Sequence, residues 1–330
     1  MPQPFAWERR SGQQVVFTGS APHMEQSEVK AMTLTRRQFA FGTAAGLLSA
    51  GVPACADAVP VDLVVGTRVL EVKGKAAKVY GIQDAQGRPG INMLTSGQFA
   101  VRLKNSLPIE TLVHWHGLTP PLKFDGTPHL SGPTLQPGES RDYVFATRDT
   151  GTHWMHSHVG LQEQQMLAAP LIIRESEHPL EDEQEHVVML HDFTFRDPAE
   201  ILAELQKGGG GHAMHHNMAG MKDMKDMPGM ASMAGMTNDI VFDALLANDR
   251  TLDDPDVVQA EKGGRFRLRI INGAAASNMW IDLGAIEGAL IAVDGRVVVP
   301  VRGKRFPLAI AQRADIRLSL PAGSGAWPVL

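Results

Sequence analysis

Two His-x-His pairs constrain this sequence more than any other feature. His114-Trp115-His116 and His156-Ser157-His158 stand about forty residues apart, each in a short stretch typical of a β-strand. Side chains of a strand alternate between its faces, so residues i and i+2 point the same way, roughly 6–7 Å apart. Each pair therefore offers two imidazoles on one face, and a fold that places the strands side by side would gather four.

The bland interpretation of a histidine in a strand is a surface residue or a satisfied core residue. Here each pair shares its face with an apolar side chain, Leu112 in the first and Trp154 in the second. Burying neutral imidazoles beside apolar groups is costly unless their nitrogens find partners. A metal supplies that partner, since imidazole binds copper, zinc, iron and nickel. The predicted metal ligands are His114, His116, His156 and His158.

Length and composition bound the class of protein. At 330 residues the chain can hold two ordinary domains, and 43% hydrophobic residues suffice for buried cores. The net charge of −5 does not indicate nucleic-acid binding. The single cysteine, Cys55, excludes a disulfide framework, a cysteine-based zinc site and an iron–sulfur cluster.

Residues 1–58 are predicted to be an N-terminal extension with an export signal. Arg36-Arg37 precede a largely apolar run over residues 39–52, which is short for a membrane span. Small residues between 54 and 58 suit signal-peptidase cleavage, and the twin arginines indicate the Tat route. We expect a periplasmic or exported protein with no membrane span in its mature chain. A chance arginine pair before a helix is the alternative, and lipidation of Cys55 stays open.

The pattern from about residue 61 onward is all-β. Short apolar runs are separated by Gly, Pro, Asp and Asn, and Phe99, Val101 and Leu103 share one face, as in a half-buried strand. We predict a first β-sandwich over residues 59–176. Its clearest strands are at residues 69–72, 99–103, 111–116, 143–145 and 168–173.

A second sandwich is predicted over residues 177–330. Acid-rich residues 175–185 indicate a linker before it, and Asp294-Gly295 is a hairpin-type turn within it. A short helix is expected where Asp197 can act as N-cap, with Pro198 and Glu200 behind it and Gly208 to Gly211 at its end. The clearest strands are at residues 187–190, 266–270, 290–293 and 316–318.

A methionine-rich insertion occupies residues 208–238. Its methionines recur at a strict spacing of three, which does not form one core stripe on a helix, and its Gly and Pro residues oppose a helix. Thioether sulfur prefers Cu(I), so we predict copper capture, with low complexity without a ligand as the alternative. The candidate Cu(I)-binding residues are Met218, Met221, Met224, Met227, Met230, Met233, Met236, His212, His215 and His216.

The two histidine motifs resemble those of the bacterial multicopper oxidases, which include laccase-like and copper-resistance enzymes. His114-Trp115-His116-Gly117 is similar to their first copper motif, and residues 151–158 are similar to their second. The methionine-rich insertion and similar stretches at residues 125–128, 160–164, 267–273 and 278–280 support the resemblance. It extends from about residue 61 to the end. The implied fold is all-β, with tandem cupredoxin-like (plastocyanin-like) Greek-key β-sandwiches.

The resemblance also implies copper as the cofactor and a role for each histidine. His114 would help bind a type 2 copper, and His116, His156 and His158 would bind a type 3 pair. Together these coppers form a trinuclear centre, where dioxygen is reduced to water while phenols or Cu(I) are oxidised one electron at a time. The partners implied are therefore dioxygen and a reducing substrate or Cu(I).

Three residues near the histidine pairs need separate interpretation. His153 faces away from the pair at His156 by strand alternation, so we do not count it as a ligand. Asp125 and Ser157 are candidates to orient the imidazole rings through their second nitrogens.

Two further motifs of the family, H-x-x-H-x-H and H-C-H-x-x-x-H, do not occur in this sequence. They supply the other trinuclear ligands and the type 1 copper site, but no cysteine follows Cys55 and no histidine follows His216. We therefore expect either an N-terminal two-domain portion of an oxidase, its second domain incomplete, or a protein that has lost catalysis.

The alternative function is copper binding and sequestration in the periplasm without catalysis. A copper-free structural relative is disfavoured because both His-x-His pairs are present. A copper nitrite reductase is disfavoured because it would need a cysteine-containing type 1 motif near the second pair, and the sequence has none there.

Overall fold

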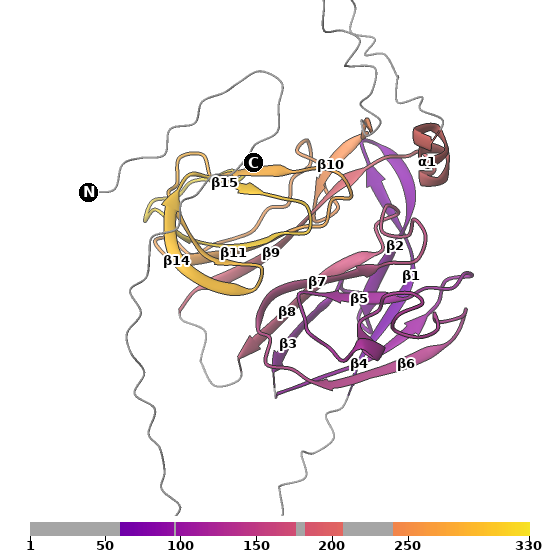
Figure 1. Cartoon of the computed structure of the whole chain (residues 1–330). Coiled ribbons are helices and arrows are strands. Elements are labelled where there is room, and N and C mark those ends of the chain that lie inside the picture. The colour runs from indigo at the N-terminus through magenta and orange to yellow at the C-terminus, as the bar shows by residue number, and fades with distance from the viewer. Residues whose placement is uncertain (1–59, 96, 176–181, 207–239) are drawn as a thin grey trace, which may run out of the picture. The chain divides into compact units, whose positions relative to one another are not determined.

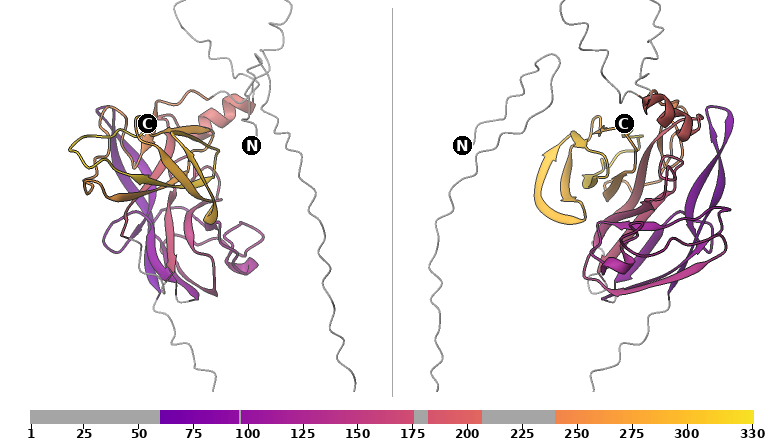
Figure 2. Two further views of the ribbon diagram at one scale, coloured as in Figure 1. Left: turned by 90° about the vertical axis from the view of Figure 1, so that its left-hand side faces the viewer. Right: turned by 45° about the vertical axis from the view of Figure 1, so that its right-hand side comes forward.

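The structure, a computed structural model, describes residues 60–95, 97–175, 182–206 and 240–330. All the described residues belong to one compact unit, within Cys55–Leu330. The predicted export signal, Cys55 and the methionine-rich insertion lie outside the described residues. The strands can be followed by colour in Figure 1 and from two further sides in Figure 2.

Residues 60–175 contain two four-stranded sheets. In the first, in the order β2-β1-β4-β6, β1 pairs with β4 in parallel and the other neighbours are antiparallel. In the second, in the order β3-β8-β7-β5, β3 and β8 are parallel. The strands are β1 Val61–Val72, β2 Lys75–Asp84, β3 Ile91–Thr95, β4 Gln98–Asn105, β5 Val113–His116, β6 Ser140–Ala146, β7 Gly151–Ser157 and β8 Ala168–Glu175, with the 3-10 helix η1 at Leu122–Phe124.

Side chains from both sheets form one apolar core. Phe99 of β4 packs against Trp115 of β5 and Phe145 of β6, with ring centroids 4.9 and 4.8 Å apart. Trp115 and Met155 are fully buried in this core. Because side chains alternate along a strand, burying Trp115 and Met155 turns His114, His116 and His156 to the opposite face.

Residues 182–330 form a six-stranded sheet, in the order β10-β9-β11-β16-β13-β14, and a two-stranded sheet of β12 and β15. Here too one pair, β9 and β11, is parallel. The elements are β9 Gln184–Phe193, α1 Pro198–Gln206, β10 Ala244–Ala247, β11 Arg265–Asn272, β12 Met279–Asp282, β13 Gly288–Val293, β14 Arg296–Gly303, β15 Arg305–Leu308 and β16 Arg313–Ser319.

Two local predictions are confirmed in this part of the chain. The Oδ1 atom of Asp197 accepts a hydrogen bond of 2.8 Å from the N–H of Ala199, as an N-cap does at the start of α1. Asp294 and Gly295 join β13 to β14 with φ of 52° and 77°. Two successive positive φ angles define the type I′ hairpin turn that an Asp-Gly pair favours.

The predicted linker over residues 175–185 is wrong at both ends. Strand β8 runs to Glu175, and β9 begins at Gln184. Two of the acidic side chains that suggested a linker are paired with arginines: Glu183 with Arg267 and Arg317, and Glu185 with Arg269. The strand predicted at residues 111–116 is also shorter than expected. Strand β5 begins at Val113, and Thr111 forms an isolated bridge with Leu135.

The Glu183 cluster predicts acid sensitivity. Burial raises the pKa of Glu183, but hydrogen bonds from Arg317 and Arg267 outweigh it and hold the pKa below its ordinary value. A depressed folded-state pKa adds stability that is fully present above the unfolded-state pKa, about 4.3, and is lost as pH falls through the folded-state value. We expect the free energy of unfolding in urea to decline below about pH 4.3, with a shallower decline in Glu183→Gln. Equal slopes in the two proteins would contradict this assignment.

Candidate metal centre

The pairing of β5 with β7 brings the two His-x-His motifs together. The strands are antiparallel, and in their register His114 lies opposite His156 and His116 lies opposite Trp154. The ring centroid of His114 is 5.5 Å from that of His116, 5.6 Å from that of His156 and 4.7 Å from that of His158. Residues 42 positions apart in sequence thus form one cluster, because strand register sets which side chains meet.

Three nitrogen atoms of this cluster converge. One ring nitrogen from each of His114, His116 and His156 lies within 4.8 Å of the other two. Of these histidines, His116 and His156 have their Nδ1 and Nε2 atoms, respectively, 3.2 Å apart. Two nitrogens at this distance can share one metal ion, because metal–imidazole bonds are about 2.0–2.1 Å long.

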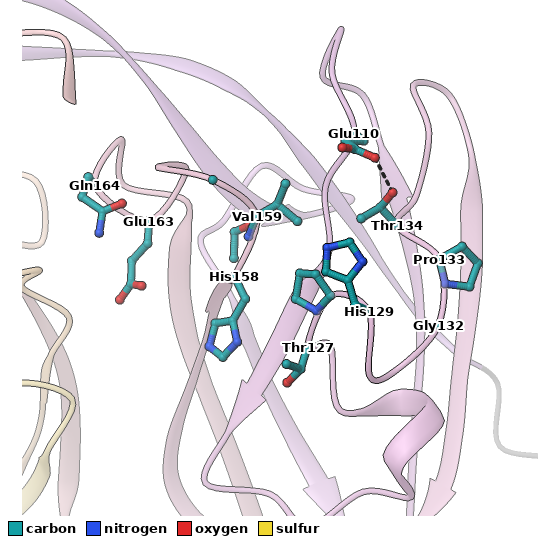
Figure 3. A pocket seen from close by; sticks show the side chains of 13 residues that line it. Glu110, Thr127, His129, Gly132, Pro133, Thr134, His158, Val159, Glu163 and Gln164 are labelled. Atoms are coloured by element: carbon teal, nitrogen blue, oxygen red, sulfur yellow. Dashed lines mark hydrogen bonds between the residues drawn. The ribbon is translucent and has the colours of Figure 1, made fainter. Parts of the chain in front are cut away.

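His158 belongs to the cluster by ring contact, and its side chain is exposed. Its centroid is 4.8 Å from that of His156, but its nitrogens are not part of the group of three. It lines an open groove of about 780 Å³ together with Glu163 and the loop that carries Thr127 and His129. Figure 3 shows His158 and Glu163 on one side of this groove and His129 and Thr134 on the other.

The partner of His114 Nδ1 shows which ring nitrogen carries the proton. His114 Nδ1 lies 2.7 Å from the backbone oxygen of Asp125 and 3.5 Å from its carboxylate. A carbonyl oxygen only accepts, so Nδ1 carries the proton and Nε2 presents its lone pair. Asp125 therefore orients this ring, as the sequence suggested, through its main chain. Ser157 does not orient a ring, since its hydroxyl donates to Gln162 Oε1 at 2.8 Å.

Burial keeps the imidazoles in the form that binds metal. Burial, and after it the charge of Arg313, lowers the pKa of His116 to about 3. Burial is also the largest cause of the lowered pKa of His114 and of His158. Only a neutral imidazole has a free lone pair, so at pH 7 these three rings can bind a metal without first losing a proton.

Two aromatic residues beside the cluster have different roles. Trp154, which is 1% exposed, stacks on His156 at a centroid distance of 4.2 Å and an interplanar angle of 15°, and on His116 at 4.9 Å. Its packing holds both rings at fixed orientations. His153 lies outside the three converging nitrogens, and its Nε2 atom is 3.2 Å from the backbone oxygen of Thr150.

The turn after η1 depends on a glycine that no other residue can replace easily. A Cβ on Gly126, which has a φ of +82°, would lie 1.9 Å from the backbone oxygen of Val113. The clashing atom belongs to the backbone of a paired strand and cannot move aside as a side chain could. We therefore expect Gly126→Ala to lower the free energy of unfolding by roughly 2–5 kcal/mol, which includes the strain of the left-handed backbone conformation. Gly132 also has a positive φ, +107°, but no atom lies within 4 Å of the position of its Cβ. Gly132→Ala should therefore show only the left-handed strain, about 1–2 kcal/mol. Urea denaturation measures both, and equal losses would contradict the steric argument.

The residues present fit copper. The three convergent donors are imidazole nitrogens, which suit copper, zinc, iron and nickel, and the cluster has an open side at His158. Among the described residues, no other group of three His, Cys, Asp or Glu side chains converges in this way. The predicted Cu(I) ligands of the methionine-rich insertion, from His212 to Met236, lie outside the part of the chain that the structure describes.

Comparison with known proteins identifies the family. A family model described as multicopper oxidase matches residues 65–178, and a second model with the same description matches residues 184–329. The chain belongs to the multicopper oxidase family, and this membership implies copper as the cofactor. It is 30% identical over 287 residues to copper resistance protein A of Escherichia coli, and 28% identical over 245 residues to the multicopper oxidase MmcO of Mycobacterium tuberculosis.

These alignments cover the two proteins unequally. They include 82% of this chain and 47% of the Escherichia coli protein, and 73% of this chain and 47% of the Mycobacterium protein. The chain thus spans about half the length of the curated relatives it matches.

Solved structures confirm the fold class. The multi-copper oxidase from Pseudomonas thermotolerans matches 82% of this chain and 60% of its own, with a TM-score of 0.63 and 24% identity. The blue copper oxidase from Nitrosomonas europaea matches 81% of this chain and 77% of its own, with a TM-score of 0.61 and 21% identity. The predicted all-β, cupredoxin-like fold is therefore confirmed. In the ranges that the structure describes, no helix is both long and apolar enough to cross a lipid bilayer.

Proposed function

We propose that this chain binds copper through His114, His116, His156 and His158 and supplies one half of the trinuclear centre of a multicopper oxidase. The observation that carries the proposal is the convergence of three imidazole nitrogens within 4.8 Å on paired strands. By its resemblance to the family, His114 belongs to the type 2 copper and the other three histidines to the type 3 pair. The proposed reaction couples oxidation of phenols or Cu(I) to reduction of dioxygen to water.

The residues of this chain perform three tasks in the proposed function. Copper, when bound, supplies the one-electron chemistry that dioxygen reduction requires. Asp125 holds His114 in the tautomer whose Nε2 atom is free, and Trp154 fixes the planes of His116 and His156 by stacking. Burial keeps the pKa of His116 at about 3, so the ring remains a ligand rather than a cation at neutral pH.

Efficient catalysis requires groups that this sequence does not contain. The family's type 1 motif includes a cysteine, and the only cysteine here is Cys55. We propose that the type 1 site and the remaining trinuclear ligands are supplied by a segment that carries the motifs H-x-x-H-x-H and H-C-H-x-x-x-H. Sequencing the gene beyond the codon for Leu330 tests this directly, since a frame that continues into those motifs would join the two halves.

A second candidate function is copper sequestration without catalysis. The observation that favours it is the methionine repeat from Met218 to Met236, whose soft sulfur atoms suit Cu(I). Export to the periplasm by the twin-arginine signal at Arg36-Arg37 is part of both proposals. A cell fractionation with Arg36-Arg37 changed to Lys-Lys tests the export route, and unchanged periplasmic recovery would contradict it.

The two functions differ in oxygen consumption. We expect the purified chain, loaded with copper and dialysed, to retain copper by elemental analysis. Little oxygen should be consumed with a phenol or Cu(I) as reductant, because no type 1 site passes electrons to the cluster. Rapid turnover by this chain alone would contradict the assignment of the missing groups, and a chain that retains no copper would contradict both functions.

A further inference from the structure

The loop after β7 is held by one buried side chain. Gln162 is 5% exposed, and its Oε1 atom accepts hydrogen bonds from the hydroxyls of Thr111 at 2.7 Å and Ser157 at 2.8 Å. Its Nε2 atom donates to the backbone oxygen of Glu110 at 2.8 Å. These bonds tie the loop to the strand that carries His156 and to the segment before β5. The residue that follows Gln162 therefore has a defined place beside the cluster.

That residue is Glu163, and its carboxylate faces the far nitrogen of His156. Glu163 Oε2 lies 3.2 Å from His156 Nδ1, and the imidazole is 7% exposed while the carboxylate is 24% exposed. Among the residues that the structure describes, this buried Nδ1 atom has no partner in hydrogen-bonding geometry. The carboxylate is thus within reach of this nitrogen, on a side chain that is free enough to turn toward it.

The other contacts of His156 leave only one useful orientation. Its Nε2 atom faces His116 Nδ1 at 3.2 Å, and one face of its ring is covered by Trp154 at 4.2 Å. Copper can use Nε2 only if the ring proton sits on Nδ1, and that proton needs an acceptor in a buried site. An ionised carboxylate is the strongest acceptor that a protein offers, because it carries a full charge.

We propose that Glu163 is a positioning residue, whose carboxylate accepts the Nδ1 proton of His156 and so fixes the tautomer that directs Nε2 at the copper site. The purpose of this arrangement rests on the proposed copper function, but the tautomer itself does not. Glu163 reaches His156 at Nδ1 rather than at the predicted ligand atom Nε2, and it acts only through His156. Its negative charge also offsets the positive charge that a bound copper ion brings.

Long-range proton–nitrogen NMR spectra of the metal-free, nitrogen-15-labelled chain test the tautomer. The His156 signals are assigned by their loss in His156→Gln. We expect the proton of His156 on Nδ1 in the wild-type chain and in Glu163→Gln, whose amide oxygen still accepts. In Glu163→Leu the acceptor is gone, so the proton should move to Nε2. Gln164→Leu changes the neighbouring groove residue and should leave the tautomer unchanged.

Copper affinity, measured by competition with a chromophoric chelator, tests the consequence. Loss of a partner of a ligating histidine typically weakens metal binding 10- to 100-fold, so Glu163→Leu should weaken copper binding about 10- to 100-fold. Glu163→Gln should recover most of that loss, and Gln164→Leu should bind as the wild-type chain does. The proton–nitrogen spectra of the same samples show whether each variant is folded.

The two experiments separate this inference from the proposed function. A His156 tautomer that is the same in wild type and Glu163→Leu would overturn the inference, whatever the copper affinities. Equal copper affinities of Glu163→Leu and Gln164→Leu would also overturn it. A wild-type chain that does not bind copper at all, with a tautomer that depends on Glu163, would contradict the proposed function and leave the positioning role supported.

Discussion

Replacing His114 and His156 together with alanine should abolish copper binding at the β5–β7 cluster. The change removes two of the three converging nitrogens and leaves only that of His116. Loss of an outer partner alone costs 10- to 100-fold in metal affinity, so loss of two direct ligands should cost more than about 100-fold. Elemental analysis after loading and dialysis measures the effect, in chains from which residues 208–238 are deleted so that the methionine-rich insertion binds none.

His186→Ala is the matched control for this experiment. His186 is a partly exposed histidine on β9 that contacts Asp256 at 3.0 Å and lies outside the cluster. The His186→Ala chain should bind as much copper as the parent chain with the same deletion. Unchanged copper content in the His114→Ala, His156→Ala double variant would refute the ligand assignment.

Replacing Arg269 with methionine should cause the largest loss of stability. Arg269 is 4% exposed and donates to Asp315 at 2.7 Å, Glu185 at 2.6 Å and Thr152 at 3.0 Å. Burial raises the pKa of Asp315, and the charge of Arg269 is the main factor that lowers it. Removing one partner of a buried ion pair costs about 3–5 kcal/mol. The melting temperature should fall by roughly 6–20 °C in differential scanning calorimetry.

Two further variants show whether the loss comes from the uncompensated carboxylate. Arg269→Met combined with Asp315→Leu should recover much of the stability, because replacing a whole buried pair by apolar side chains is often close to neutral. Arg305→Met breaks an ion pair whose arginine is 65% exposed, with Asp282 at 3.1 Å, and should change the melting temperature little. A double variant less stable than Arg269→Met would contradict this account.

The parts of the site that follow from local pattern could be predicted from the sequence. Period-two alternation placed His114 and His116 on the face opposite Trp115, and the structure agrees, with Trp115 in the core. The same alternation separated Trp154 and His156 from Met155, which is fully buried in the core. These predictions concern neighbours along one strand, where backbone geometry alone decides the direction of a side chain.

The parts of the site that depend on contacts between distant segments could not be predicted from the sequence. Nothing in the sequence around His156 indicates that Glu163 returns to its Nδ1 atom, because that contact depends on how Gln162 is bound in the loop. The charge that lowers the pKa of His116 comes from Arg313, on β16. The predicted linker at residues 175–185 was too long for the same reason, since Glu183 and Glu185 are paired with arginines far along the chain.

Strand β7 serves two parts of the molecule with alternate residues. Thr152 bonds to Asp315 at 2.6 Å, Trp154 packs with Met189 and Ile271, and His156 belongs to the histidine cluster. A slip of one residue in the pairing of β7 would turn all of these side chains to the wrong face at once. A misregistered chain would therefore lose its histidine cluster and its packing together. Such a protein would be open to proteolysis, so a chain that keeps its fold but lacks the histidine cluster would not accumulate from such a slip.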